Sequence, residues 1–320
     1  MMYRGQYAQL QAPGLHSIFT DFLDLNMRSS EYDKIFNVET SDSAFEDEQE
    51  FAGLGPMVEK PEGESIEYDA LIEGGTKRFL HTTYALGIRG SFELYDDDQY
   101  GLIKKAPKAL AQSAMFTIEQ NAWNVFNLGF TTVTSIDGVS LFNTQHPLLG
   151  GPAATNRGPG VPAIITSVGG AAGTYPNRPS PATDLSITSL QAAINHFERL
   201  TNSQGFPVSL IPRFLMVSPI NKWIAREILG SAYRPYTAQN EINALVGEDL
   251  VSFVGHYLTD DDAWFLLPEK SSHQLKFYWR KKLDEKYDDD FDTQSLKELA
   301  FMRFSVGAVS HLGTWGSPGV

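Results

Sequence analysis

The chain contains 320 residues, of which 42% are hydrophobic and 12% aromatic, enough to build a substantial core in one or two domains. Its 25 Lys and Arg residues against 39 Asp and Glu residues give a formal net charge of −14 at pH 7, which opposes nonspecific binding to nucleic-acid phosphates or anionic lipid. The sequence has no cysteine, so disulfide bonds, thiolate zinc sites and catalytic thiols are excluded.

The first 60 residues carry no apolar run of signal-peptide length, and no window of the sequence resembles a membrane-spanning helix. We therefore expect a soluble protein made in the cytoplasm. Short apolar patches and the acidic stretch ETSDSAFEDEQEF predict helices near 15–27 and 42–51, in an N-terminal arm without a core of its own. Such an arm needs a partner outside the local chain.

Alternating apolar residues predict two strands between residues 66 and 88, with Gly74 and Gly75 at the turn that joins them. An isolated two-stranded ribbon is marginally stable in water, so this hairpin also needs a partner. Because the remaining elements do not require the hairpin for their core, we expect a deletion of residues 66–92 to leave a folded subunit that cannot assemble.

The longest helical pattern follows, with apolar residues at every third or fourth position from Leu102 to Phe126. Pro107 suits the first turn of a helix better than its interior. We therefore expect a short helix that ends near 105 and a long helix over 107–128, which would span about 33 Å.

Glycine and proline are so frequent between residues 150 and 182 that we expect a long irregular loop there. The elements expected after this loop do not alternate as in a doubly wound sheet, so the predicted class is α+β. Helices are expected within 183–202 and 220–233; strands are expected within 213–219, 249–258, 262–268, 273–282 and 295–315, the last two around an acidic turn at 283–294.

The stretch LFNTQHPLLGG, residues 141–151, presents His146 and Pro147 in a polar setting. A histidine there could act as a metal ligand or a general base. However, the chain has no G-x-S-x-G motif, and no second histidine lies three to five residues from His146. We interpret His146 and Pro147 as a structural turn, with the imidazole hydrogen-bonded to a backbone group.

Aspartate triplets at 96–98, 260–262 and 288–290 are the pattern that calcium favours. Asp288, Asp290 and Asp292 alternate and are the only metal candidates, but Thr293 and Leu299 stand where an EF-hand has glycine and glutamate. We interpret the triplets as helix caps, solvated turns and contacts to a basic neighbour. No metal, cofactor or catalytic residue is expected.

The segment GPGVPA, residues 158–163, matches the letters of a dinucleotide-binding fingerprint. Pro159 and Pro162 prevent the helix whose N-terminus would hold the pyrophosphate, so we interpret the match as fortuitous. No P-loop, H-E-x-x-H motif or basic and aromatic stripe is present.

Four stretches taken together resemble the major capsid proteins of tailed bacteriophages, in particular the Mu-like major head subunit group. They are LYDDDQYGLIKKAPKALAQSA (94–114), LFNTQHP (141–147), GFPVSLIPRFLMVSPINKWIAREIL (205–229) and LTDDDAWFLLP (258–268). The resemblance covers roughly residues 60 to 315 and is carried by the order of the stretches. Ser218, where this group is expected to have proline, and the segment 150–182 depart from the pattern.

The resemblance implies the tailed-phage capsid fold, with an arm at 1–60, an extended hairpin loop at 61–97, a peripheral domain at 98–130 and 274–306 that contains the long spine helix, and an axial domain at 131–273 and 307–320. It also implies that the arm and the hairpin lie on neighbouring subunits. The residues expected in assembly contacts are Tyr68, Gly74, Gly75, Tyr84, Phe92 and Asp288.

The implied function is that of a major capsid subunit without catalytic activity. It would assemble with itself into hexamers and pentamers of an icosahedral shell, made in the bacterial host cytoplasm, that encloses double-stranded DNA without reading its sequence. Portal and scaffold or decoration proteins are expected partners, and a membrane is not. Two alternatives stay open: the shell protein of an encapsulin nanocompartment, and a soluble hydrolase or calcium-binding protein.

Overall fold

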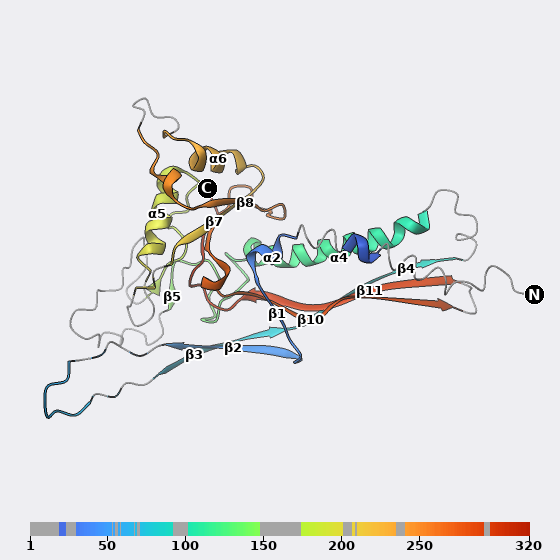
Figure 1. The fold of residues 1–320 in the computed structure, drawn as a ribbon, viewed down its shortest axis with the longest axis horizontal. Helices are drawn as coiled ribbons and strands as arrows, with labels where there is room; N and C mark the ends of the chain where they lie inside the picture. Colours follow the sequence, from blue (N-terminus) through green and yellow to red (C-terminus); the bar gives the residue numbers. More distant parts are fainter. Residues whose placement is uncertain are drawn as a thin grey trace, which may run out of the picture. The chain divides into compact units, whose positions relative to one another are not determined.

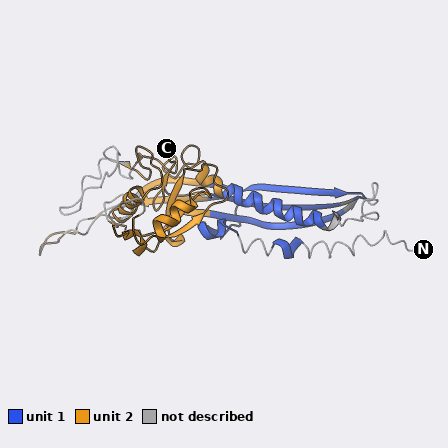
Figure 2. Cartoon of the chain, turned by 90° about the horizontal axis from the view of Figure 1, so that it is seen from above, with its two compact units in different colours: residues 1–46, 79–122, 277–306 blue, residues 47–78, 123–276, 307–320 orange. Residues whose placement is uncertain are grey.

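A computed structural model describes residues 19–23, 30–52, 54, 57, 59–66, 68, 71–91, 102–147, 174–200, 207–208, 210–234, 241–290 and 295–320. The chain divides into two compact units (Figure 2). Unit 1 comprises residues 1–46, 79–122 and 277–306, and unit 2 comprises residues 47–78, 123–276 and 307–320.

A four-stranded sheet in the order β1-β10-β11-β4 forms the body of unit 1 (Figure 1). Its strands are β1 (Asn37–Thr40), β10 (Leu275–Asp290), β11 (Ser295–Ala308) and β4 (Thr82–Gly90). β4 runs antiparallel to β11, from Leu296 opposite Gly90 to Phe304 opposite Thr82. Phe304 stacks on Phe277 of β10 with ring centroids 5.0 Å apart, so the long strands share an aromatic core.

The long helix α4 (Leu102–Asn127) packs on this sheet through Leu110 and Ala111, which are buried together with Ala300 of β11. The two helices predicted here are one, because Pro107 lies inside α4. Close to the helix N-terminus, proline removes a single bond, to the carbonyl four residues earlier. The apolar contacts with the sheet keep the helix continuous across that missing bond.

A second four-stranded sheet, in the order β12-β9-β7-β8, lies in unit 2. Its strands are β12 (Trp315–Ser317), β9 (Trp264–Pro268), β7 (Pro212–Val217) and β8 (Val251–Val254), and the helices α5 (Ile187–Glu198) and α6 (Lys222–Gly230) belong to the same unit. Leu190 of α5, Ala225 of α6 and Leu266 of β9 lie in one buried apolar cluster. Both helices therefore pack on the sheet through an apolar face.

Several predicted elements are confirmed in unit 2. The helix predicted within 183–202 is α5, whose N-terminus carries a capping box between Ser186 and Ser189. The strand and helix predicted at 213–219 and 220–233 are β7 and α6. The strands predicted at 249–258 and 262–268 are β8 and β9.

The remaining described elements are short. They are α2 (Tyr32–Ile35), β2 (Phe45–Ala52), β3 (Ile72–Leu80), β5 (His146–Pro147), β6 (Thr174–Tyr175), η3 (Ala244–Gly247) and η4 (Lys270–Ser272), and residues 19–23 are also helical. β2 pairs with β3, and β5 pairs with β6. Among the residues that the structure describes, no helix is long and apolar enough to cross a membrane.

The helix predicted over 42–51 is wrong, because this acidic stretch is the strand β2. Its pairing with β3 is accompanied by ion pairs that the local sequence does not reveal. Arg78 of β3 lies 2.7 Å from Asp47, and Lys276 lies 2.5 Å from Glu48. Tertiary partners thus override the weak strand propensity of an acidic segment.

The hairpin predicted over 66–88 is wrong in its pairing. Gly74 and Gly75 lie inside β3 rather than at a turn, and Ile66 and Tyr68 of the first predicted strand do not lie in a strand. β3 pairs with β2, whereas β4 pairs with β11. The ribbon that the structure contains is therefore β2–β3, joined by the connection at 53–71.

The acidic turn predicted at 283–294 is largely strand, because β10 continues to Asp290. Lysines along the strand offset its carboxylates: Lys281 lies 2.9 Å from Asp284. The residues between Asp290 and Ser295 lie outside the described part of the chain, as does most of the glycine- and proline-rich segment, at 148–173.

Candidate functional site

The β2–β3 ribbon is held by polar contacts along its length. Arg78 donates two hydrogen bonds to Asp47, from Nε at 2.8 Å and from a terminal nitrogen at 2.7 Å. Gln49 donates to Glu73 across the same pair of strands. Hydrogen bonds from the Arg78 guanidinium hold the pKa of Asp47 below its usual range. This bidentate geometry fixes the register of the two strands.

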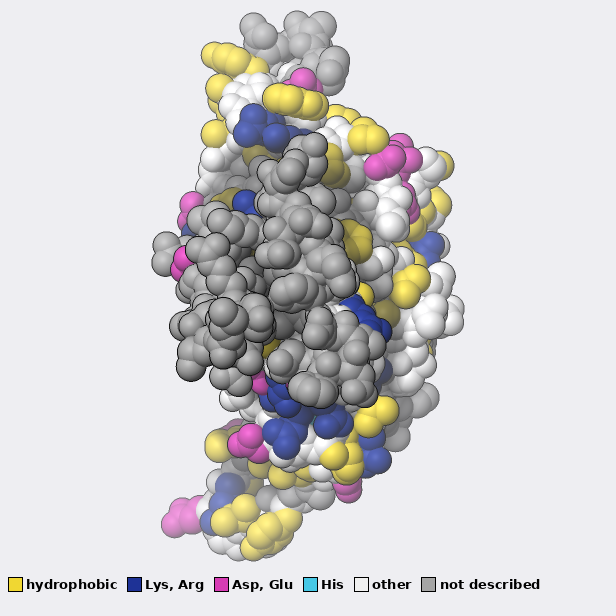
Figure 3. Space-filling view, turned by 90° about the vertical axis from the view of Figure 1, so that its right-hand side faces the viewer, with side chains coloured by type: hydrophobic (Ala, Val, Ile, Leu, Met, Phe, Trp, Pro, Cys, Tyr) yellow, Lys and Arg dark blue, Asp and Glu magenta, His cyan; other side chains and the backbone are white. Residues whose placement is uncertain are grey.

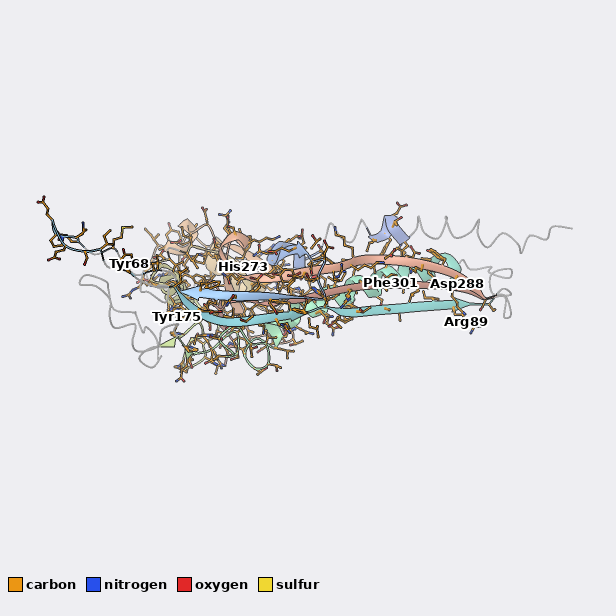
Figure 4. All side chains as sticks on the ribbon, turned by 90° about the horizontal axis from the view of Figure 1, so that it is seen from below. Tyr68, Arg89, Tyr175, His273, Asp288 and Phe301 are labelled. Atoms are coloured by element: carbon orange, nitrogen blue, oxygen red, sulfur yellow. The ribbon has the colours of Figure 1, made fainter. Side chains whose placement is uncertain are left out.

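Apolar side chains gather without cover on the connection between β2 and β3. Tyr68 is 94% exposed and is labelled in Figure 4. Exposed hydrophobic residues of this region are Phe51, Leu54, Met57, Ile66, Tyr68 and Leu71. A run of exposed apolar residues on one projecting segment is typical of a protein-binding surface. Hydrophobic side chains also reach the surface at other places, as the yellow atoms in Figure 3 show.

Gly75 lies where β3 passes close to the loop after α4. A Cβ atom at this position would overlap the backbone carbonyl of Ile136. The neighbouring Lys77 donates to both the carbonyl and the hydroxyl of Thr134, at 2.9 and 3.0 Å. The glycine therefore permits close approach of two backbones, which is a different role from the turn predicted for it.

The other predicted assembly residues are dispersed. Tyr84 is half-buried, stacks on Phe304 at 4.8 Å and donates to Asn121 at 3.0 Å, so its contacts lie within unit 1. Asp288 is exposed near the end of β10, where Figure 4 also places Arg89 of β4. Phe92 lies outside the described residues.

Of the aspartates considered for calcium, Asp288 is exposed on β10. The side chain of Asp290 and the whole of Asp292 lie outside the described part of the chain. In the triplet before β9, Asp260 accepts a hydrogen bond from the backbone N–H of Asp262 at 3.1 Å. That contact is an Asx turn, in agreement with the turn interpretation.

A cavity of about 210 Å³ lies in unit 1 between α4 and the sheet. Leu110, Ala114 and Met302 line it, together with Tyr84, Ala85, Leu86, Ser113, Thr117, Leu283 and Ala300. Tyr84 is the one titratable side chain of this lining, and burial raises its pKa. An apolar lining of this kind offers no acid and base pair for catalysis.

His146 is fully buried and makes side-chain contacts in unit 2. Its Nδ1 lies 2.6 Å from Oδ2 of Asp137, and its Nε2 lies 3.1 Å from Oδ1 of Asn177. The ring stacks on His311 with centroids 3.8 Å apart and planes 8° apart. The predicted backbone partner is therefore wrong, and His146 and Pro147 form the short strand β5, opposite Tyr175 and Thr174, rather than a turn.

Asp137, His146 and His311 have the composition of a metal site, and their ligand atoms lie within 4.8 Å of one another. Their geometry does not fit one. Zinc at about 2.1 Å from each ligand in tetrahedral geometry would hold two ligand atoms about 3.4 Å apart. The 2.6 Å between Asp137 and His146 is a hydrogen-bond distance. Moreover, the two nearly parallel rings hold their nitrogen lone pairs in separate parallel planes, so the two lone pairs do not point at one ion.

Sequence reasoning singled out His146 but missed its partners. Asp137, Asn177 and His311 are separated from it by 9, 31 and 165 residues, and no motif spacing links them. The one available signal was the density of polar residues around 137–146. The structure shows that these residues form only part of a polar cluster. Asn177, which follows β6, and His311 of the C-terminal segment complete it.

Comparison with known proteins identifies the relatives of this architecture. The phage capsid protein family matches residues 76–314. No curated protein sequence matches the chain. Among solved structures, a chain of the capsid of Cyanophage P-SCSP1u is similar with a TM-score of 0.55 and 11% identity, covering 90% of this chain and 87% of that one.

Two further structures have the same fold. A chain of Microbacterium phage Oxtober96 aligns with a TM-score of 0.52 and 11% identity over 88% of this chain and 85% of that one. A chain of the procapsid of bacteriophage JBD30 aligns with a TM-score of 0.52 and 14% identity over 99% and 76%, respectively. At these identities the similarity establishes the tailed-phage capsid fold, and the family match over residues 76–314 establishes that the chain belongs to the phage capsid protein family.

Proposed function

We propose that this chain is a major capsid subunit that assembles with copies of itself into the hexamers and pentamers of an icosahedral shell around double-stranded DNA. The observation that carries the proposal is the match of the phage capsid protein family to residues 76–314. The four sequence stretches described above further support membership of the Mu-like major head subunit group.

Within such a subunit, unit 1 would be the peripheral domain, with α4 as its spine helix, and unit 2 would contain the axial domain. The connection between β2 and β3 would lie on a neighbouring subunit. Its exposed apolar residues, Tyr68 and Leu71 among them, support this role because a neighbour would remove them from water. The shell would form in the cytoplasm of the bacterial host and persist in the virion.

The negative charge of the chain suits a container for DNA. Each copy carries a formal net charge of −14, so a shell of such copies would on average repel phosphates. Packaged DNA would thus be enclosed without tight binding and without sequence-specific contacts. Portal, scaffold and decoration proteins are proposed partners on the basis of the family alone.

Both alternatives are less well supported. The family match is to phage capsid proteins, which does not favour the encapsulin nanocompartment. A hydrolase or a calcium-binding protein would need converging side chains. In the described residues, however, Asp288 and Asp290 lie along a strand, and His146 is buried against Asp137 and Asn177. The capsid fold itself is structural rather than catalytic.

Electron microscopy of the purified full-length chain tests the proposal. We expect capsomers or closed shells, and particles recovered from an infected host should contain double-stranded DNA. A species that stays monomeric under every assembly condition would refute the capsid role. Particles that contain a protein cargo in place of DNA would instead support the nanocompartment.

A further inference from the structure

The hydrogen bonds of Asn177 determine which nitrogen of His146 carries hydrogen. The Asn177 amide nitrogen donates to the carbonyl of Leu141 at 2.7 Å and to the hydroxyl of Thr314 at 3.2 Å, and its oxygen accepts from the N–H of Asn143 at 2.8 Å. Turning the amide over would place donor against donor and acceptor against acceptor. The oxygen therefore faces His146, whose Nε2 must donate to it.

The other nitrogen of His146 faces a carboxylate. Asp137 uses Oδ1 to accept from the N–H of Val139 at 3.0 Å and from the hydroxyl of Ser135, and it presents Oδ2 to His146 Nδ1 at 2.6 Å. A neutral ring with its hydrogen on Nε2 would point a lone pair at this oxygen. Because two acceptors cannot lie 2.6 Å apart without a shared hydrogen, a proton lies between them.

The proton belongs to the ring. Burial raises the pKa of Asp137, but hydrogen bonds from His146 and Ser135 and the charge of His146 outweigh burial and hold this pKa at about 2. Its Oδ1 already accepts two hydrogen bonds, which favour the charged form, so the carboxylate is the ionised partner. His311 stays neutral, since burial and then the neighbouring charge of His146 lower its pKa well below the usual value.

We propose that His146 carries a proton on both ring nitrogens, and that its ion pair with Asp137 is an acid-sensitive clasp that closes the loop 134–147, on which His311 of the C-terminal segment 309–317 stacks. Backbone hydrogen bonds near the clasp join the C-terminal segment to the loop and to Asn177. Ile136 donates from its backbone to Val309 at 2.8 Å, and Gly316 donates to the carbonyl of Asn177 at 3.1 Å.

Three further titratable side chains lie near the His146 cation and the Asp137 anion, and burial shifts the pKa of each towards its neutral form. Glu50 on β2 and Lys77 on β3 both interact with Asp137, and burial raises the pKa of the former and lowers that of the latter. Tyr175 on β6 lies against His311 at 5.5 Å, and burial raises its pKa. The neutral His311 ring lies flat on the charged ring, which favours the cation.

Nitrogen-15 NMR of the histidine-labelled full-length chain at pH 7 tests the proton count, in solution or by magic-angle spinning on assembled particles. We expect both ring nitrogens of His146 to show N–H signals. Asp137→Asn supplies an amide donor to Nδ1 and should convert the ring to the neutral form with hydrogen on Nε2 alone. His311→Phe keeps the stacking without a titratable ring and should leave the signals of His146 unchanged.

A single N–H on His146 in the unaltered chain would overturn the proposal. So would a shift of its Nδ1 signal on addition of one equivalent of Zn²⁺, because that result would assign the position to a metal instead of a proton.

Acid unfolding provides a second measurement. Because the pKa of Asp137 is lowered in the folded chain, the stability it contributes is present above about pH 4 and is lost as the pH falls towards 2. The melting temperature of Asp137→Asn should lie about 4–8 °C below that of the unaltered chain at pH 6. The gap should narrow as the pH falls from 4 towards 2, and a gap of constant size across this range would contradict the clasp.

Discussion

Single side chains in this subunit are constrained by backbones and charges far away in the sequence. Gly75 is required by the passage of β3 close to the carbonyl of Ile136. Glu119 of α4 is required by the first turn of α2, where it accepts hydrogen bonds from the N–H groups of Glu31 at 2.7 Å and Tyr32 at 3.1 Å. Each residue invites a substitution that changes one interaction and little else.

Replacing Gly75 by alanine should destabilise unit 2, since the added methyl group would overlap the Ile136 carbonyl and force one backbone to move. Overpacking of this kind costs about 1–3 kcal/mol. Thermal unfolding measures the effect, and Gly230→Ala is the matched control because a Cβ atom there meets nothing within 4 Å. Equal melting temperatures of the two variants would contradict the close approach.

Replacing Glu119 by glutamine should flatten the pH dependence of stability. Burial raises the pKa of Glu119 to about 7, although the N–H groups of Glu31 and Tyr32 oppose this. A carboxyl whose pKa is raised on folding stabilises the fold below its unfolded pKa, and this stability is lost as the pH rises towards 7.

The Glu119→Gln variant retains Oε1, which faces the N–H groups of both Glu31 and Tyr32, and cannot ionise. Its free energy of unfolding should equal that of the unaltered chain at pH 4.5 and should be higher by about 1–3 kcal/mol at pH 8. Urea unfolding at both pH values measures this difference. Glu119→Ala, which leaves the N–H groups of α2 without their acceptor, should be less stable than the unaltered chain at both pH values. If the glutamine variant kept the pH dependence of the unaltered chain, the raised pKa of Glu119 would be refuted.

Whole elements are placed by partners that lie outside their own sequence. The acidic strand β2 pairs with β3 and meets Lys276 from a third segment. β3 and β4 follow one another in the chain and yet belong to different sheets. The deletion of 66–92 expected from the sequence would therefore remove β3 and β4 together, and with them an edge of the sheet in unit 1.

A better test of the assembly element replaces residues 57–68 by a flexible Gly-Ser segment of equal length. Because β2, β3 and both four-stranded sheets remain, we expect a chain with unchanged thermal unfolding that no longer forms shells. A variant with Ile66, Tyr68 and Leu71 changed to serine tests the apolar side chains alone and should weaken assembly in the same direction. Normal shells from the full replacement would refute the role of this connection.

At the scale of the whole molecule, charge and exposed apolar surface oppose one another in assembly. Copies with a formal net charge of −14 repel each other, whereas side chains such as Tyr68 gain from being buried in a neighbour. The repulsion is screened over about 10 Å at 0.1 M salt and about 3 Å at 1 M salt, while apolar contact is not weakened by screening.

Assembly should therefore become faster and more complete as NaCl is raised from 0.05 to 0.5 M. Light scattering of the purified chain measures the rate, and electron microscopy of the same samples separates shells from aggregates. Charge reversal at the exposed pair Arg213 and Asp249, which lies outside the β2–β3 ribbon, keeps the net charge and is the matched control. Assembly that slows with salt would indicate that ion pairs between subunits, rather than apolar contacts, dominate.

The local pattern of residues was sufficient for elements whose period is visible within one segment. The capped amphipathic repeat of α5, the apolar run of β7 and the long period of α4 all predicted the observed elements, and the resemblance over roughly 60 to 315 predicted the capsid fold. These signals are local because a helix or a buried strand presents its apolar face at a fixed spacing.

Pairing between distant segments followed instead from the folded chain. β2 became a strand through Arg78 and Lys276, and Gly75 became a point of contact rather than a turn. His146 acquired Asp137, Asn177 and His311 only when β6 and the C-terminal segment closed around it. Strand register and buried polar networks depend on which segments of the chain meet in space. The spacing of residues along any one segment does not contain that information.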